Sequence, residues 1–269
     1  MNSITSRQNP IVQRCRDLAR RRPASSDEVL LDGMHLVSEA LNAGLAVTTA
    51  LVSARVLASD EGVALGHRLE RAGAALYKAS DPAIEAASPV RTSTGIVVIA
   101  RVASTPARTV WTPAPALVVG VTGVQDPGNV GAILRAAEAA GATGAIVTEG
   151  SADPLGWKAL RGSMGSALRL PLMLGATVSA ACREARRLGV VVAATTPLDG
   201  QDLYQTDLRA PTMVLIGGEG AGLLDEVVTG ADVRIRIPMH HPVESLNAAV
   251  AAGVILFEAQ RQRRTPART

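Results

Sequence analysis

The chain has 269 residues, of which 47% are hydrophobic and 19% are charged, and this suits a globular protein of one large or two ordinary domains. Aromatic residues make up only 2%, so aliphatic side chains must fill the core, and a base-stacking RNA-binding platform is not expected. The net charge is +3, and the longest apolar run, 248–257, is too short to span a bilayer, so we expect no membrane partner.

The first hundred residues alternate short strands with helices, a pattern typical of an α/β domain. Pro10 begins a helix that reaches about Arg22, and Gly44 and Gly73 end two later helices. Nothing in this part looks catalytic. The proline-containing interval 104–115 is predicted to be a linker. The predicted strands are 28–31, 47–52, 75–78 and 95–100, and the predicted helices are 10–22, 34–42, 62–71 and 82–87.

The rest of the chain repeats the alternation with buried strands. In open parallel sheets, ligands bind beyond the carboxyl ends of the strands. Four predicted strands end in glycine-rich or polar loops, at 122–129, 195–203, 217–222 and 238–245, which indicates a built site. The predicted strands are 116–121, 145–147, 170–174, 190–194, 212–216 and 234–237, and the predicted helices are 130–140, 154–167, 177–188, 223–228 and a last one reaching 264.

The last helix has its own start signal. Ser245 is predicted to be its N-cap, which places Ser245 and Asn247 where unbonded N–H groups and the positive dipole end gather. Spacing alone favours a capped helix without any further role. A recurrence at i, i+4, i+8 and i+11 predicts its apolar face, made of Leu246, Val250, Val254 and Phe257.

Several common sites are excluded by their missing motifs. No G-x-G-x-x-G follows a strand, neither lysine lies in a P-loop, and no G-x-S-x-G is present. His240 and His241 are adjacent, with no cysteine or third histidine nearby, so we expect no metal. Cys15 and Cys182 form no C-x-x-C pair and suggest no disulfide framework, which fits a reducing cytoplasm.

Both ends of the chain are basic. Residues 1–22 carry six arginines against Asp17 alone, and the tail after Glu258 carries four arginines and no acid. This distribution indicates a polyanionic partner, although solvated ends would give the same pattern. An N-terminal targeting peptide is a further alternative, but the segment lacks a secretory apolar region and we favour a folded helix. The predicted phosphate contacts are Arg14, Arg20, Arg21 and Arg22.

Three stretches, 129–135, 216–222 and 237–247, resemble in order and spacing the motifs of the SpoU (TrmH) branch of SPOUT RNA 2′-O-methyltransferases. Residues 3–101 are similar to the L30e-like substrate-binding domain of this branch, although Asp32 stands where the family usually has glutamate. The resemblance implies an α/β fold class. Its expected parts are an L30e-like α/β/α domain at 1–103, the linker at 104–115, and a SPOUT α/β domain with a deep trefoil knot at 116–269.

The resemblance also implies a function. The chain would transfer a methyl group from S-adenosylmethionine to a ribose 2′-OH, in 23S ribosomal RNA, as a cytoplasmic homodimer. A transfer-RNA substrate and a non-catalytic RNA-binding or ribosome-assembly role stay open as alternatives. The implied catalytic residues are Asn129, Arg135, Glu219, Ser245 and Asn247. The implied cofactor-binding residues are Thr195, Thr196, Gly217, Gly218, Glu219, Ile237, Met239 and Leu246.

The residue chemistry supports these roles. Methyl transfer requires an electrophilic sulfonium beside an oxygen that loses its proton, with stabilisation of the negative charge on that oxygen. Because a guanidinium is almost always protonated, we interpret Arg135 as a phosphate clamp and oxyanion stabiliser; family proposals make it the base, and that question stays open. Asn129, Ser245 and Asn247 can orient Arg135 and the nucleotide. Glu219 can pair with an arginine or with Asn129.

Overall fold

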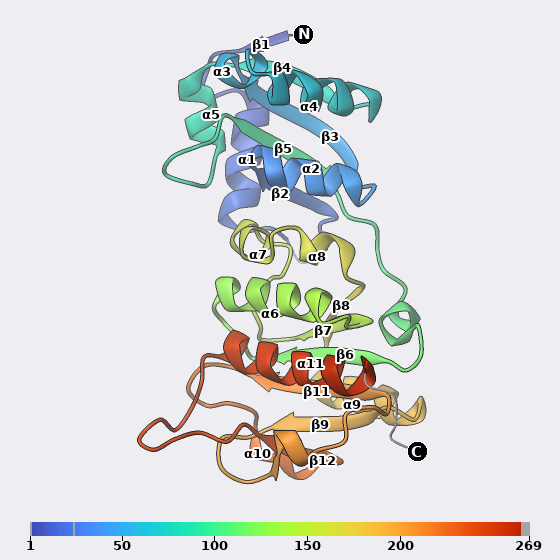
Figure 1. Ribbon diagram of the computed structural model, residues 1–269. Helices are drawn as coiled ribbons and strands as arrows, with labels where there is room; N and C mark the ends of the chain where they lie inside the picture. Colours follow the sequence, from blue (N-terminus) through green and yellow to red (C-terminus); the bar gives the residue numbers. More distant parts are fainter. Residues whose placement is uncertain (1, 24, 265–269) are drawn as a thin grey trace. The chain divides into compact units, whose positions relative to one another are not determined.

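The computed structural model describes residues 2–23 and 25–264 (Figure 1). Its contacts divide the chain into two compact units. The first consists of Met1–Ser104 and Leu155–Arg169, and the second of Thr105–Pro154 and Leu170–Thr269. The predicted α/β fold class is confirmed, because each unit contains a sheet with its own helices. No helix in the described residues is long and apolar enough to cross a membrane.

The first unit is built on a mixed sheet of order β1-β4-β3-β5-β2. The pairs β1/β4 and β4/β3 are parallel, whereas β5 is antiparallel to both β3 and β2. The predicted strands all form, and the sequence analysis missed only β1, a three-residue edge strand. The strands are β1 (Asn2–Ile4), β2 (Glu28–Asp32), β3 (Ala46–Ser53), β4 (Ala75–Ala79) and β5 (Ile96–Arg101).

The helices of the first unit begin at recognisable caps. Asn9 accepts from the backbone N–H of Ile11 at the start of α1, and Ser59 does the same for Gly62 at the start of α4. Helix α1 buries Val12 and Cys15, and it contacts α5 and β2. The helices are α1 (Pro10–Arg20), α2 (Met34–Asn42), α3 (Ala54–Leu57), α4 (Asp60–Arg71), α5 (Asp81–Ala87), α7 (Trp157–Ser163) and α8 (Ser166–Arg169).

The segment 155–169 differs from its prediction in two ways. A single helix was expected over 154–167, but Met164 adopts a left-handed conformation, with φ 51°, and Gly165 follows with φ 91°. These two residues separate α7 from α8, because an α-helix cannot continue through positive φ. The segment also packs with the first unit, where Arg161 lies 3.8 Å from Asp32, rather than with the second unit in which the sequence analysis placed it.

The second unit is built on a seven-stranded sheet of order β10-β12-β9-β11-β6-β7-β8, and every neighbouring pair is parallel. The central strands are buried along their length, as the continuous aliphatic runs predict. The strands are β6 (Leu117–Thr122), β7 (Gly144–Thr148), β8 (Leu172–Ala176), β9 (Val191–Thr195), β10 (Gln201–Asp202), β11 (Thr212–Gly217) and β12 (Val233–Arg236).

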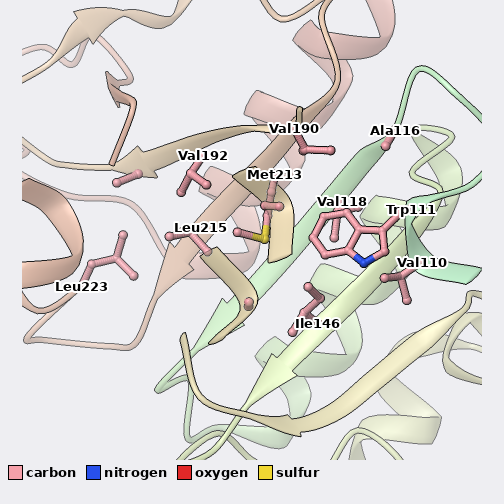
Figure 2. Packing of buried hydrophobic residues seen from close by; sticks show 13 residues of the cluster. Val110, Trp111, Ala116, Val118, Ile146, Val190, Val192, Met213, Leu215 and Leu223 are labelled. Carbon is pink, nitrogen blue, oxygen red and sulfur yellow. The ribbon is translucent and has the colours of Figure 1, made fainter. Parts of the chain in front are cut away.

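One face of this sheet packs against α9 (Val178–Arg187), α10 (Asp225–Thr229) and the 3-10 helix η1 (Ala107–Trp111). Figure 2 shows this cluster, in which Trp111 and Val110 lie beside Val118 and Ile146. Val110 is fully buried and Trp111 is 7% exposed. The interval 104–115, expected to be a linker, therefore contributes to the core of the second unit.

The other face is covered by α6 (Pro127–Ala139) and α11 (Ala248–Arg264), which lie side by side (Figure 1). Helix α6 buries Val130, Ile133, Leu134 and Ala137. The apolar face predicted for the last helix is not the face that α11 buries. Its buried residues are Ala252, Ile255, Leu256, Glu258 and Ala259, whereas Leu246, Val250 and Phe257 are 38%, 52% and 47% exposed.

Candidate active site

The candidate site lies along one edge of the seven-stranded sheet. Strands β12, β9, β11 and β6 are consecutive neighbours and all parallel, so their carboxyl ends meet at the same edge. The loops that leave these ends begin at Ile237, Thr196, Gly218 and Gly123. The fold therefore brings the three motif stretches of the sequence analysis to neighbouring positions.

The loop after β6 is joined to the loop after β11 through Glu219. The side-chain amide of Asn129 donates to Glu219 Oε1 at 2.6 Å, and the backbone N–H of Gln125 donates to Glu219 Oε2 at 3.2 Å. The hydrogen bond from Asn129 is the largest of the effects that hold the pKa of Glu219 below its usual value. Of the two predicted partners of Glu219, Asn129 is therefore the one found. Gln125, which contributes only backbone, carried no signal in the sequence.

Asn129 is itself fixed at the start of α6. Asp126 is the N-cap of that helix, and its Oδ1 accepts from the backbone N–H of Asn129 at 2.8 Å. Asn129 Oδ1 accepts in turn from the side-chain amide of Asn247 at 3.0 Å. One chain of hydrogen bonds thus runs from Asn247 through Asn129 to Glu219, across residues that are 90 and 118 positions apart in sequence.

The prediction that Ser245 caps the last helix is wrong. Helix α11 begins at Ala248, and Asn247 Oδ1 accepts from the backbone N–H of Ala249 at 2.9 Å and of Val250 at 3.3 Å. Both residue types are good N-caps, so local preference could not separate them. Asn247 has the added advantage of its amide group, which bonds Asn129 while its oxygen caps the helix.

Two glycines allow close backbone packing beside Glu219. A Cβ added to Gly217 would lie 2.3 Å from the carbonyl carbon of Gly222, and one added to Gly218 would lie 2.1 Å from the carbonyl oxygen of Gly123. A side chain at Gly218 would push the loop after β11 away from the loop after β6, and one at Gly217 would disrupt the loop after β11 itself. The Gly-rich sequence is therefore required for the approach that brings Glu219 to Asn129.

Arg135 and Ser245 differ from the bonded residues. Both are exposed, and neither side chain makes a hydrogen bond or ion pair with any residue in 2–23 or 25–264. Arg135 lies on α6, less than two turns beyond Asn129. The structure therefore joins Asn129, Glu219 and Asn247 and leaves the guanidinium of Arg135 and the hydroxyl of Ser245 available to other molecules.

The expected cofactor positions lie in loops at the same sheet edge. Thr195 Oγ1 donates to the carbonyl of Leu215 at 2.9 Å, and the backbone N–H of Thr196 donates to the carbonyl of Ile235 at 2.9 Å, so these two are held by neighbouring strands. The loop from Ile237 to Asn247 is bonded far less. Within the described residues, the backbone N–H groups of Met239, Ser245, Leu246 and Asn247 donate no hydrogen bond.

These loops fit a nucleoside-containing cofactor such as S-adenosylmethionine. Unused backbone donors suit the acceptors of a base or a carboxylate, and such groups are expected to find partners when a ligand covers them. The half-buried Ile237 and the exposed Leu246 offer apolar surface beside these donors. No group of three or more His, Cys, Asp or Glu side chains that could hold a metal ion is found in the part of the chain that the structure describes.

The predicted RNA-contacting arginines fall into two groups. Arg14 makes a two-pronged contact with Glu28, and Arg22 donates to the carbonyl of Ser26. Arg20 and Arg21 are exposed and make no such contact with the described residues. The structure therefore keeps Arg20 and Arg21 available to a partner, whereas Arg14 is already occupied within the first unit.

Comparisons with known proteins agree with the motifs. Residues 116–257 match the SpoU rRNA Methylase family. An uncharacterised tRNA/rRNA methyltransferase of Synechocystis is 33% identical over 97% of this chain and 94% of its own length. The 23S rRNA (guanosine-2′-O-)-methyltransferase RlmB of Xylella fastidiosa is 40% identical over 55% of this chain, and the match takes in 59% of that protein.

Solved structures extend the likeness to the whole chain. An rRNA methyltransferase of Sinorhizobium meliloti with bound AdoMet superposes with a TM-score of 0.87 and 28% identity, over 98% of this chain and 99% of that one. The SpoU methyltransferase AviRb of Streptomyces viridochromogenes, in complex with AdoMet, gives 0.82 and 29%, over 95% and 99%. With the family match and a relative similar over nearly its full length, this chain belongs to the SpoU rRNA methylase family.

Proposed function

We propose that this chain transfers a methyl group from S-adenosylmethionine to a ribose 2′-hydroxyl of large-subunit ribosomal RNA. The observation that carries the proposal is the hydrogen-bond chain Asn247–Asn129–Glu219, which joins all three family motifs at the start of the helix that carries Arg135. Relatives named as 23S rRNA 2′-O-methyltransferases and an AdoMet-bound rRNA methyltransferase support the substrate and the cofactor. The cofactor supplies an electrophilic methyl group on a positively charged sulfur.

Different residues of the chain bind the cofactor, bind the RNA and stabilise the developing charge. The loops at Thr195–Thr196, Gly217–Gly218 and Ile237–Met239, together with Leu246, hold the cofactor, chiefly through backbone groups. Arg135 binds the RNA phosphate and stabilises the negative charge that grows on the 2′-oxygen as its proton passes to solvent and the methyl carbon exchanges its bond to sulfur for a bond to this oxygen. A guanidinium offers five N–H donors and no acceptor, which favours this role over that of the base. Ser245 contributes a hydroxyl that can orient the ribose.

Glu219 positions Asn129 and takes no part in the reaction itself. Its two carboxylate oxygens already accept from Asn129 and from the backbone of Gln125, so it fixes Asn129, and Asn129 fixes Asn247. A depressed pKa keeps Glu219 charged at neutral pH, and only the charged form accepts from both donors at full strength. The arrangement is expected to weaken as the pH falls through that lowered pKa.

A direct assay tests the proposed function. The purified protein, radiolabelled S-adenosylmethionine and an unmodified transcript of 23S ribosomal RNA should yield a methylated nucleotide whose 3′ linkage resists alkali, because alkaline cleavage needs a free 2′-OH. Calorimetry should show cofactor binding in parallel. Absence of cofactor binding at saturation would favour the non-catalytic RNA-binding role. Methylation of transfer RNA transcripts but not of 23S RNA would favour the alternative substrate.

The functional protein is proposed to be a homodimer in the cytoplasm. The apolar face predicted for the last helix is exposed at Val250 and Phe257 of α11 and at Leu246 just before it. A second copy would cover this face, and the neighbouring small residues Ala251 and Gly253 would permit close packing. Light scattering should therefore report a dimer for the wild type, and Val250→Glu with Phe257→Glu should give a folded monomer. An active wild-type monomer at low micromolar concentration would contradict the proposal.

Two further assignments rest on the family. The first unit is proposed to be an L30e-like domain that binds the RNA substrate, and the second to carry the trefoil knot. The similarity of this chain to AviRb and to the Sinorhizobium enzyme over nearly the whole length supports both. A pull-down of the 23S transcript by the isolated catalytic part, compared with the full chain, would test the first assignment.

A further inference from the structure

The outward face of helix α1 carries a polar stripe of four residues, of which only Arg20 was among the predicted RNA contacts. Gln13, Arg16, Asp17 and Arg20 stand at i, i+3, i+4 and i+7, so they follow one side of the helix. All four are exposed, and they line a shallow groove. The opposite side of the helix buries Val12 and Cys15 against the first unit. The stripe therefore faces solvent, and it is not needed for packing.

The charged side chains of this stripe have no hydrogen-bond or ion-pair partner among the described residues. Arg16 and Arg20 make no hydrogen bond or ion pair with any described residue, and neither does the carboxylate of Asp17. Other arginines at the same end of the chain are engaged: Arg14 with Glu28, and Arg7 with Glu85 at 3.9 Å. The arginines of helix α1 therefore differ by their position around the helix axis. Arg14 is bonded to Glu28, whereas Arg16 and Arg20 have no polar partner among the described residues.

We propose that Arg16 and Arg20 form a two-point clamp for the RNA backbone on helix α1, an inference that rests on the proposed RNA methyltransferase function. The two residues are four positions apart, so their Cα atoms are separated by about 6 Å along the helix axis. Two guanidinium forks spaced in this way can bind phosphate oxygens at two points of one strand. Gln13 adds a neutral amide next to Arg16. Arg14 takes no part in the clamp.

The negative charge of Asp17 allows a further test of the clamp, because its removal should change the affinity for RNA in a predictable direction. Its carboxylate stands between the two arginines in the groove and repels phosphate, so it limits non-specific binding. If phosphate occupies the groove, Asp17→Asn should raise the affinity for RNA. If the stripe is only a solvated surface, the same change should leave the affinity unaltered.

The experiment measures filter binding of an unmodified 23S transcript by the full-length protein across a series of salt concentrations. Arg16→Gln with Arg20→Gln is expected to lower the affinity by roughly ten-fold or more, because two charge-assisted contacts are lost. The slope of log affinity against log salt should become shallower by about 1.4 to 1.8, since each phosphate contact contributes roughly 0.7 to 0.9. Arg16→Lys with Arg20→Lys should lose affinity but keep most of the slope.

Arg14→Gln is the matched control, because it removes one charge from the same helix. It should leave the salt slope unchanged and instead lower the melting temperature, since it removes the partner of the mostly buried Glu28, whose side chain is 12% exposed. The salt slope lost per removed charge can be compared between Arg14→Gln and the Arg16/Arg20 variant. If the two values are equal, RNA responds to the general electrostatic field of the protein, and the clamp is wrong. Inorganic phosphate and duplex DNA serve as competitors. Displacement of the transcript by phosphate alone at equal charge concentration would overturn the assignment to RNA.

The test separates this inference from the proposed function. If the wild type methylates RNA but the double variant binds as tightly as the control, the clamp is wrong and the proposed function stands. If the wild type binds cofactor and RNA without transferring a methyl group, the proposed function fails, while the binding data still decide on the clamp.

Discussion

Arg135 and Arg263 lie on α6 and α11, two helices packed side by side, yet they have opposite surroundings. Arg263 donates to the backbone carbonyls of Leu208, Pro115, Ala116 and Ala210, at 2.7–3.0 Å. Burial lowers the pKa of Arg263. Arg135 is exposed and has no polar partner among the described residues. The same residue type therefore holds the chain together at one position and is left free at the other.

The difference separates stability from function. A guanidinium with its donors used on backbone carbonyls cannot serve a substrate, and its removal leaves acceptors without partners. A guanidinium without partners adds little to folding, so its removal should cost the fold little. Mutation of Arg135 should therefore reduce activity, whereas mutation of Arg263 should reduce stability.

The largest effect is expected for Arg135→Ala. The variant should lose methyl transfer by on the order of 10²–10³ in rate, because it lacks the group that stabilises the developing 2′-oxyanion, and loss of phosphate positioning should add to this. Its affinity for S-adenosylmethionine and its melting temperature should be nearly unchanged. Single-turnover kinetics and calorimetry on the same preparation would measure all three. Arg135→Lys should restore little, since a point ammonium cannot copy the guanidinium fork. Near-wild-type turnover by Arg135→Ala on its true RNA would show that the catalytic centre lies elsewhere.

Arg263→Ala should give the reverse pattern. Loss of a charged donor shared by four carbonyls is expected to lower the free energy of unfolding by about 1.5–3 kcal/mol. Activity per folded molecule should stay close to that of the wild type at low temperature. Urea unfolding gives the first quantity, and the methyl-transfer assay gives the second. Arg264→Ala is the matched control, because Arg264 is the next residue, is exposed, and its side chain makes no hydrogen bond or ion pair with the described residues. Equal destabilisation by both variants would contradict the role assigned to Arg263.

The comparison also explains how far the sequence could predict the site. The resemblance to the family motifs identified Asn129, Glu219 and Asn247, and the polar loops after the strands predicted a site at one sheet edge. The choice between Ser245 and Asn247 as cap could not be made locally, since Asn247 is selected by a bond to Asn129, 118 positions away. Periodicity predicted the apolar face with Val250 and Phe257, but it could not show that this face is exposed, because the pattern does not tell what covers the face.

The fold was likewise predictable where local signals decide and not where distant contacts decide. Strong local signals, such as the glycines after α2 and α4 and the continuous aliphatic strands, predicted the elements of both units. Elements that depend on distant partners were missed: β1 exists only through its pairing with β4, and the packing of 155–169 with the first unit depends on contacts such as Arg161 with Asp32. Neither partner is close in sequence.

Asn247→Ala is expected to affect both stability and function. The helix loses the oxygen that caps it, which should cost about 1 kcal/mol, and Asn129 loses the amide that fixes it. Because the cap lies next to Leu246 and the cofactor loop, both the affinity for S-adenosylmethionine and the transfer rate should fall. Asn247→Ser would keep a capping oxygen without the amide. If Asn247→Ser restores the melting temperature but not the rate, the two tasks of this residue are distinct; if it restores both, the bond to Asn129 has no functional role.

The carboxylate of Asp32 in the first unit is only partly hydrogen-bonded. Its mutation is expected to have the smallest effect, a change in the pH dependence of stability. Its carboxylate is 1% exposed, Oδ2 accepts from Ser88 Oγ at 2.6 Å, and Oδ1 has no hydrogen bond. Arg161 lies 3.8 Å away with its own side chain 48% exposed, so solvent screens the attraction. Burial is the largest effect, and it raises the pKa of Asp32 above its usual value in spite of Ser88 and Arg161.

The direction of the pH dependence follows from that shift. A carboxyl whose pKa is higher in the folded state binds its proton more tightly when folded, so stability is lost as the pH rises from the unfolded pKa through the folded one. Asp32→Asn keeps an oxygen for Ser88 and carries no buried charge, so its melting temperature should exceed that of the wild type at pH 7. The difference in melting temperature should shrink as the pH falls toward the ordinary aspartate value of 3.8, because the carboxyl of Asp32 is then protonated in the folded wild type and uncharged like the amide of the variant. Asp27→Asn is the control, because Asp27 also lies 3.8 Å from an arginine but is 58% exposed, and it should show no such difference. A lower melting temperature for Asp32→Asn at pH 7 would mean that the contact with Arg161 outweighs the cost of burial, and that this pair fastens α7 to the first unit.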